Sequence, residues 1–100
     1  MKTNQSLYTG QYIAGKWRPG STGVPLIDIN PFNQAILAEI IQASQADLDE
    51  AYRCAAAAQK AWAAMSVSHR TSVLLNAARI MEQRHDEIVN WLIAESGRPV

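Results

Sequence analysis

The segment between Ser66 and Glu95 constrains the fold most, because its apolar residues cover more of a helix than one neighbour could bury. One stripe at helical spacing consists of Val67, Leu74, Ala78, Met81, His85, Ile88 and Leu92. Both flanks of that stripe carry further apolar residues, namely Val73, Leu75, Ile80, Trp91 and Ile93. A helix with this much apolar circumference needs neighbours on several sides. We therefore predict that it packs against polypeptide beyond these 100 residues.

The limits of this helical segment are also visible in the sequence. Ser66 or Ser68 is suited to cap the first turn, and Gly97 followed by Pro99 provides a stop signal at the other end. The segment is either one continuous helix or two helices that break and restart at 85–86.

An earlier helix is expected to begin at Ser44, whose hydroxyl can cap a first turn rich in acidic residues. The pattern predicts an amphipathic helix of about five turns. One predicted side holds Leu48, Ala51, Tyr52, Ala55, Gln59 and Trp62, and the opposite side holds Glu50, Arg53, Ala57, Lys60 and Ala64.

The first forty residues alternate short β-prone runs with turn residues, which predicts hairpins. Ala14-Gly15 lies between 12–13 and 16–17 and suits a two-residue hairpin loop. We expect an exposed loop at 18–23, a strand at 24–29 that ends before Pro31, a turn at 32–34, and a strand at 35–41 that is covered on both sides. The predicted fold class is α+β, with hairpins followed by two or three long helices.

The composition of the chain limits the kinds of partner and the cellular compartment that we expect. Nine basic and nine acidic residues cancel, so no charge excess favours nucleic acid. The N-terminal residues lack the apolar core of a signal peptide, and no run is long enough to span a membrane, so we expect a soluble, cytoplasmic protein. The lone cysteine, Cys54, fits a reducing compartment.

The candidate catalytic residues lack the surroundings that their chemistry needs. Cys54 lies in mid-helix one turn after Glu50, which opposes thiolate formation, so we interpret it as a packing residue. His69 and His85 have no second ligand at helical spacing, and we expect His69 to be solvated and His85 to be a hydrogen-bonded core residue.

Other residue groups that could suggest a site also have simpler explanations. Glu82, Asp86, Glu87 and Glu95 are typical of a solvated helix face. The tryptophans at 17, 62 and 91 indicate core or interface packing, and the chain contains no common nucleotide-binding, hydrolase or metalloprotease motif.

Six short motifs follow one another from Tyr12 to Pro99, and they are YIAGKW at 12–17, IDINP at 27–31, the strand at 36–41, DLDEA at 47–51 with 57–62, His69-Arg70 with 77–84, and ESGRP at 95–99. Their order resembles the N-terminal portion of the NAD(P)-dependent aldehyde dehydrogenase superfamily. Residues 86–93 are also similar to the benzaldehyde and vanillin dehydrogenase branch.

This resemblance implies a longer enzyme that oxidises an aldehyde, with an aromatic aldehyde favoured, to a carboxylic acid. Residues 1–11 would form a tail, and 12–100 an incomplete part of a cofactor-binding domain within a larger α/β Rossmann-like fold. The family uses a cysteine thiolate, an oxyanion pocket, hydride transfer to NAD or NADP, and a glutamate that activates water. No catalytic, cofactor-binding or metal residue is assigned to this chain on that basis. The family also implies a homo-oligomer.

Two further questions stay open at the level of sequence. Some family members hold a monovalent cation through positions that correspond to Ile29 and Glu95, but we favour the simpler interpretation of the two residues as a strand end and a solvated helix terminus. The chain could also be a small helical interaction module, a truncated relative, or a compact α+β domain that buries its apolar face alone or as a homodimer.

Overall fold

The computed structural model describes residues 9–98, which form two antiparallel hairpins and three helices. Met1–Tyr8 and Pro99, which the sequence analysis assigned to a tail and a helix stop, lie outside the described residues. The elements are β1 (Gln11–Ile13), β2 (Lys16–Arg18), β3 (Pro25–Ile29), β4 (Ile36–Ile41), α2 (Gln45–Ala64), α3 (Val67–Gln83) and α4 (His85–Ser96). The predicted α+β class is confirmed.

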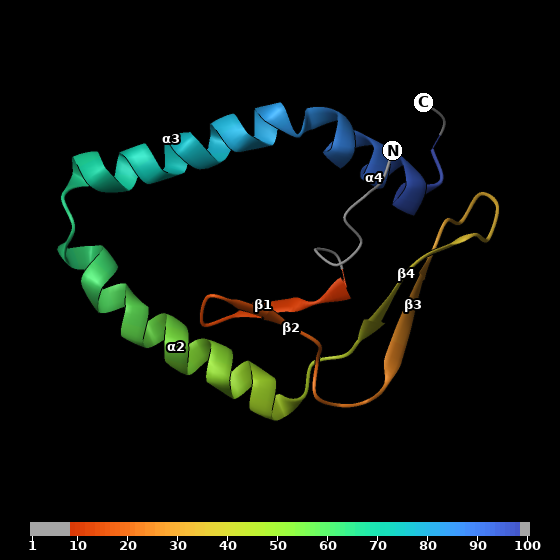
Figure 1. Ribbon diagram of the computed structural model, residues 1–100, viewed down its shortest axis with the longest axis horizontal. Coiled ribbons are helices and arrows are strands. Elements are labelled where there is room, and N and C mark those ends of the chain that lie inside the picture. Colours follow the sequence, from red (N-terminus) through yellow and green to blue (C-terminus); the bar gives the residue numbers. More distant parts are fainter. Residues whose placement is uncertain (1–8, 99–100) are drawn as a thin grey trace.

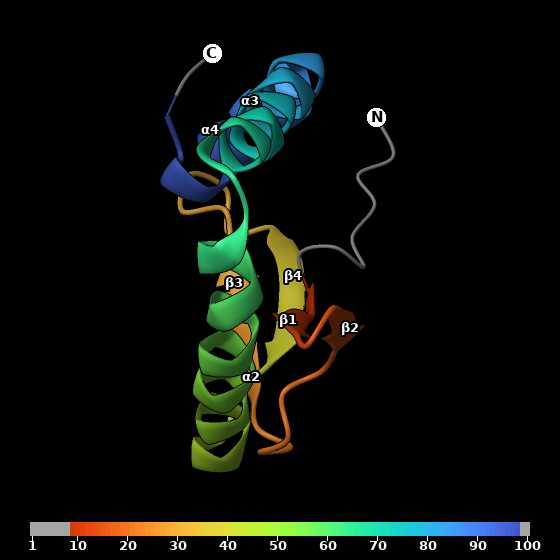
Figure 2. The same cartoon turned by 90° about the vertical axis from the view of Figure 1, so that its left-hand side faces the viewer.

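The elements form an open frame rather than packed layers (Figure 1). Helices α2 and α3 make two sides, α4 continues from α3, and the β3–β4 hairpin rises towards the end of α4. The β1–β2 hairpin lies beside α2 on the inner side of the frame. From the side, α3 and α4 overlap along the line of sight above α2 and the hairpins (Figure 2). The three helices therefore share no common core.

The first hairpin has the predicted two-residue loop. Ile13 pairs with Lys16, and both loop residues have positive φ, 54° at Ala14 and 77° at Gly15. Positive φ at both central positions matches the right-handed twist of the flanking strands. Tyr12 pairs across the hairpin with Trp17, and their ring centroids lie 5.0 Å apart.

The second hairpin turns at the predicted Asn-Pro pair. The backbone N–H of Asn30 donates to the carbonyl oxygen of Ala35 at 2.8 Å, and the Asn30 side chain accepts from the N–H of Phe32 at 2.8 Å. A register irregularity between Asp28 and Ile29 bends β3 just before this turn.

The helix termini are set by the predicted residues. Ser44 and Asp47 form a reciprocal capping box at the start of α2, and Ser66, not Ser68, caps α3 through the N–H of His69 at 3.1 Å. The segment from Val67 to Ser96 forms two helices rather than one continuous helix, because the backbone leaves helical geometry at Arg84. Gly97 ends α4 with φ 67°, a left-handed conformation that glycine adopts without strain.

The described chain buries little apolar surface. Ile13 and Ala38 are the buried hydrophobic residues, and the radius of gyration is 16.8 Å. A compact domain of this length has a radius of about 13 Å. Leu75 is 66% exposed, Ile80 is 40% exposed and Trp91 is half-buried. The prediction that this chain cannot cover its own second helical segment is confirmed.

The predicted apolar side of α2 is wrong in part. The β1–β2 hairpin lies against Ala51, Cys54 and Ala58, which rotates the contact away from Leu48 and leaves Tyr52 72% exposed. Glu50, expected on the solvent side, is half-buried. Glu50 of α2 forms an ion pair with Arg18 of β2, which turns this side of the helix towards the hairpin. Amphipathic spacing alone does not predict such a pair.

Two expectations about the hairpins also need correction. Arg18 belongs to β2 rather than to the exposed loop, and Gly20 within that loop is buried. Strand β4 is not covered on both sides within the described chain, because Ile36 is exposed and only Ala38 is buried. The aliphatic residues of β4 could be buried on both faces of the strand, but residues 9–98 contain no element that covers the second face.

Gly20 provides a test of the packing between the loop and β4. A Cβ atom at position 20 would lie 2.0 Å from the carbonyl oxygen of Gln42. We expect Gly20→Ala to lower the free energy of unfolding by about 3 kcal/mol, because backbone must move. The matched control is Gly23→Ala, where φ is 70° but no atom lies within 4 Å; it should lose about 1 kcal/mol. Denaturant unfolding of the two variants measures both values, and equal losses would contradict the tight contact.

Candidate functional site

A polar cluster joins the loop after β2 to the start of α2; we call it the α2 joint, and it consists of Arg18, Ser21, Ser44, Asp47 and Glu50. One carboxylate oxygen of Asp47 accepts from the backbone N–H of Ser44 at 2.9 Å and from the N–H and hydroxyl of Ser21, both at 2.8 Å. Arg18 donates to the other Asp47 oxygen at 3.2 Å and to Glu50 at 2.6 Å. Asp47 is 5% exposed.

The hydrogen bonds of the α2 joint stabilise its charged forms. The amide of Ser44, followed by the hydroxyl and amide of Ser21, holds the pKa of Asp47 far below its ordinary value. The Arg18 guanidinium lowers the pKa of Glu50, and Glu50 in turn raises the pKa of Arg18. Both oxygens of Asp47 have donors from the hairpin side, so the joint holds two segments of the chain together.

The end of α4 meets the β3–β4 hairpin at a second polar contact, which we call the α4 junction. A Cβ atom on Gly97 would lie 2.8 Å from Cγ of Pro31, so the helix end and the hairpin turn are in close contact. The indole Nε1 of Trp91 donates to Oε1 of Glu95 at 2.6 Å. The carboxyl of Asp28, in hydrogen-bond contact with Glu95, raises the pKa of Glu95, and burial adds to this effect.

The α4 junction bears on the cation that the family resemblance implies. It brings Glu95 beside Asp28, the residue next to Ile29, so oxygen ligands of the kind that hard cations prefer gather there. Within residues 9–98, no group of three His, Cys, Asp or Glu side chains could hold a metal ion. The interpretation of Ile29 as a strand end and of Glu95 as a helix terminus stays a prediction.

Cys54 lies half-buried on α2 against the β1–β2 hairpin. It lines a hollow of about 260 Å³ together with Tyr12, Ile13 and several alanines of α2. These neighbours are mostly apolar, whereas a reactive thiol needs an electropositive setting. The apolar surroundings support the packing role of Cys54, which stays a prediction.

The two histidines lie on different helices, His69 in the first turn of α3 and His85 at the start of α4. His85 is not a core residue, as the continuous stripe had suggested. Its side chain is 71% exposed and lies 3.0 Å from the carboxylate of Asp86. The break at Arg84 causes this difference, because it places His85 in a new first turn.

The acidic residues of the last two helices mostly have local partners. The Arg84 guanidinium donates to the two carboxylate oxygens of Glu87 at 2.9 and 2.6 Å, and Asp86 contacts His85. The contact of Glu95 with Asp28, and that of Arg18 with Glu50, were not foreseen. Both contacts join residues that are far apart in the sequence. The family motifs, which place positions 29 and 95 at one site, gave the only indication that Glu95 would lie near Asp28.

The helix N-termini of the described chain carry caps or acidic residues, whereas dinucleotide phosphates bind where helix amides are free. The amide of Asp47 in α2 and that of His69 in α3 are bonded to capping serines, and the first turn of α4 carries Asp86 and Glu87. Negative charge at these positions repels phosphate. The expectation that this chain contributes no residue to the NAD or NADP site stays a prediction.

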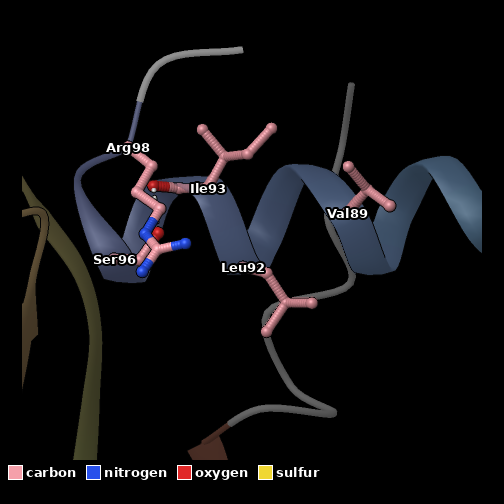
Figure 3. A pocket seen from close by; sticks show the side chains of 5 residues that line it. All are labelled: Val89, Leu92, Ile93, Ser96 and Arg98. Carbon is pink, nitrogen blue, oxygen red and sulfur yellow. Dashed lines mark hydrogen bonds between the residues drawn. The ribbon is translucent and has the colours of Figure 1, made fainter.

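The exposed apolar residues form the other notable feature. We call Leu74, Leu75, Ile80 and Met81 the α3 apolar surface, and all four are exposed. A hollow of about 390 Å³ lies along α4, lined by Val89, Leu92, Ile93, Ser96 and Arg98. Figure 3 shows that its labelled side chains come from one helix and the residues after it, with Leu92 and Ile93 on opposite sides of the helix. Such open apolar areas are typical of surfaces that pack against other polypeptide.

None of the helices among the described residues is long and apolar enough to span a membrane.

Comparison with known proteins gives a consistent result. The model of the aldehyde dehydrogenase family matches residues 17–100. A vanillin dehydrogenase from Corynebacterium glutamicum is 42% identical over 89 residues, which are 89% of this chain and 18% of that protein. An N-succinylglutamate 5-semialdehyde dehydrogenase from Ectopseudomonas mendocina is 39% identical over 89 residues, again 89% and 18% of the two chains.

The fold is similar to part of a solved enzyme. The crystal structure of a NAD-dependent benzaldehyde dehydrogenase from Corynebacterium glutamicum superposes with a TM-score of 0.86 at 42% identity. The match covers 89% of this chain and 19% of that one. The chain thus spans about a fifth of the length of the relatives it matches.

The α4 junction can be tested by titration. Because the pKa of Glu95 is raised in the folded protein, the protonated side chain stabilises the fold. This contribution to stability is present at low pH and is lost as the pH rises through the raised pKa. We expect Asp28→Asn to return the pKa of Glu95 towards its ordinary value. The NMR signal of the Trp91 indole N–H, which donates to Glu95, reports the titration. Asp86→Asn is the control, since that carboxylate is 92% exposed. An unchanged curve in Asp28→Asn would contradict the contact.

Proposed function

The chain belongs to the aldehyde dehydrogenase family, and from this premise we propose that it is the N-terminal part of an enzyme that oxidises an aldehyde to a carboxylic acid. The oxidant proposed is NAD or NADP, bound by residues outside this chain. Residues 12–100 would belong to the cofactor-binding domain, after a short tail. Support comes from matches that extend across 89% of this chain at two-fifths identity.

The observation that carries the proposal is the α3 apolar surface. Exposed large apolar side chains cost roughly 25 cal/mol for each Å² that stays in water, so a stable protein covers such a surface. The relatives are about five times longer than this chain, which provides a source for the cover. In the proposed enzyme this segment is therefore a supporting part of the fold, and the thiolate, the oxyanion donors and the water-activating carboxylate lie elsewhere.

The finer properties are proposed from the relatives. Vanillin and benzaldehyde dehydrogenases among them favour an aromatic aldehyde as substrate, and the benzaldehyde enzyme is named as NAD-dependent. A cytoplasmic homo-oligomer is proposed from the family resemblance. An independent helical interaction module or a homodimeric structural domain is not favoured, because the matches are to enzymes along almost the whole chain.

The proposal predicts that residues 1–100 alone have no dehydrogenase activity. The purified chain is incubated with benzaldehyde or vanillin and either NAD or NADP, and formation of NADH or NADPH is followed by absorbance. No steady rate above the protein-free control is expected, because no described residue supplies nucleophile and cofactor site together. A steady aldehyde-dependent rate would contradict this assignment. Reading the coding sequence after Val100 is a separate check: an open frame with a cysteine nucleophile supports the enzyme, and a stop codon does not.

Cys54 should be dispensable in the complete enzyme. We expect Cys54→Ser to leave kcat/KM for the aldehyde unchanged, because Cys54 packs against the β1–β2 hairpin and is not the nucleophile. Loss of a true nucleophile lowers the rate by several orders of magnitude. A loss of that size in Cys54→Ser, with the unfolding temperature unchanged, would show that the packing role is wrong.

The role of the α3 apolar surface can be tested by fragment complementation. Residues 1–100 are produced together with the remaining polypeptide as a second chain, and restored activity reports assembly. Leu75→Asp should weaken assembly about a hundredfold, because it places an unpaired carboxylate in the contact. The control Asn76→Asp adds the same charge at an exposed polar position of α3. Circular dichroism confirms equal helix content in both variants, and equal assembly by both would contradict the proposed cover.

A further inference from the structure

We draw no further inference here: the strongest candidate, the acidic pair of Asp28 and Glu95 where the end of α4 meets the β3–β4 hairpin, belongs to the α4 junction already described, and no second observation among residues 9–98 points to a ligand there.

Discussion

The rest of the structure depends on the mismatch between the apolar residues that this chain carries and the surface that it can cover. Leu75 and Ile80 stay exposed although both belong to residue types that normally fill cores. Two short hairpins cannot shield α3, since each hairpin has only two strands and little apolar area of its own. The open frame follows directly, because helices without a shared core separate at their connections (Figure 1).

In the absence of a large core, two polar contacts hold distant parts of the chain together. At the α2 joint, Asp47 satisfies the helix start and also binds Arg18 and Ser21 from the hairpin side. At the α4 junction, Gly97 allows the helix end to approach Pro31. Both contacts use hydrogen bonds or close backbone approach, which depend on exact geometry rather than on buried area. They connect elements that share no large buried apolar surface.

This arrangement agrees with the role of a supporting segment within a longer enzyme. Cys54 has mostly apolar neighbours, which is unlike the electropositive setting of a reactive thiol. The starts of α2 and α3 are capped by serines, and the first turn of α4 carries acidic residues. The chain instead contributes shape and apolar area. The chain matches part of a solved dehydrogenase with a TM-score of 0.86.

The sequence by itself determined the features that depend on neighbouring residues: the Ala14-Gly15 loop, the cap at Ser44, the stop at Gly97, and the excess of apolar surface on α3. Local hydrogen bonding and helical period suffice for these. Tertiary structure alone decided which side of α2 faces the hairpin, that Arg18 pairs with Glu50, and that Glu95 meets Asp28. Those outcomes depend on contacts between residues far apart in the chain, whose free energies no local pattern of residues records.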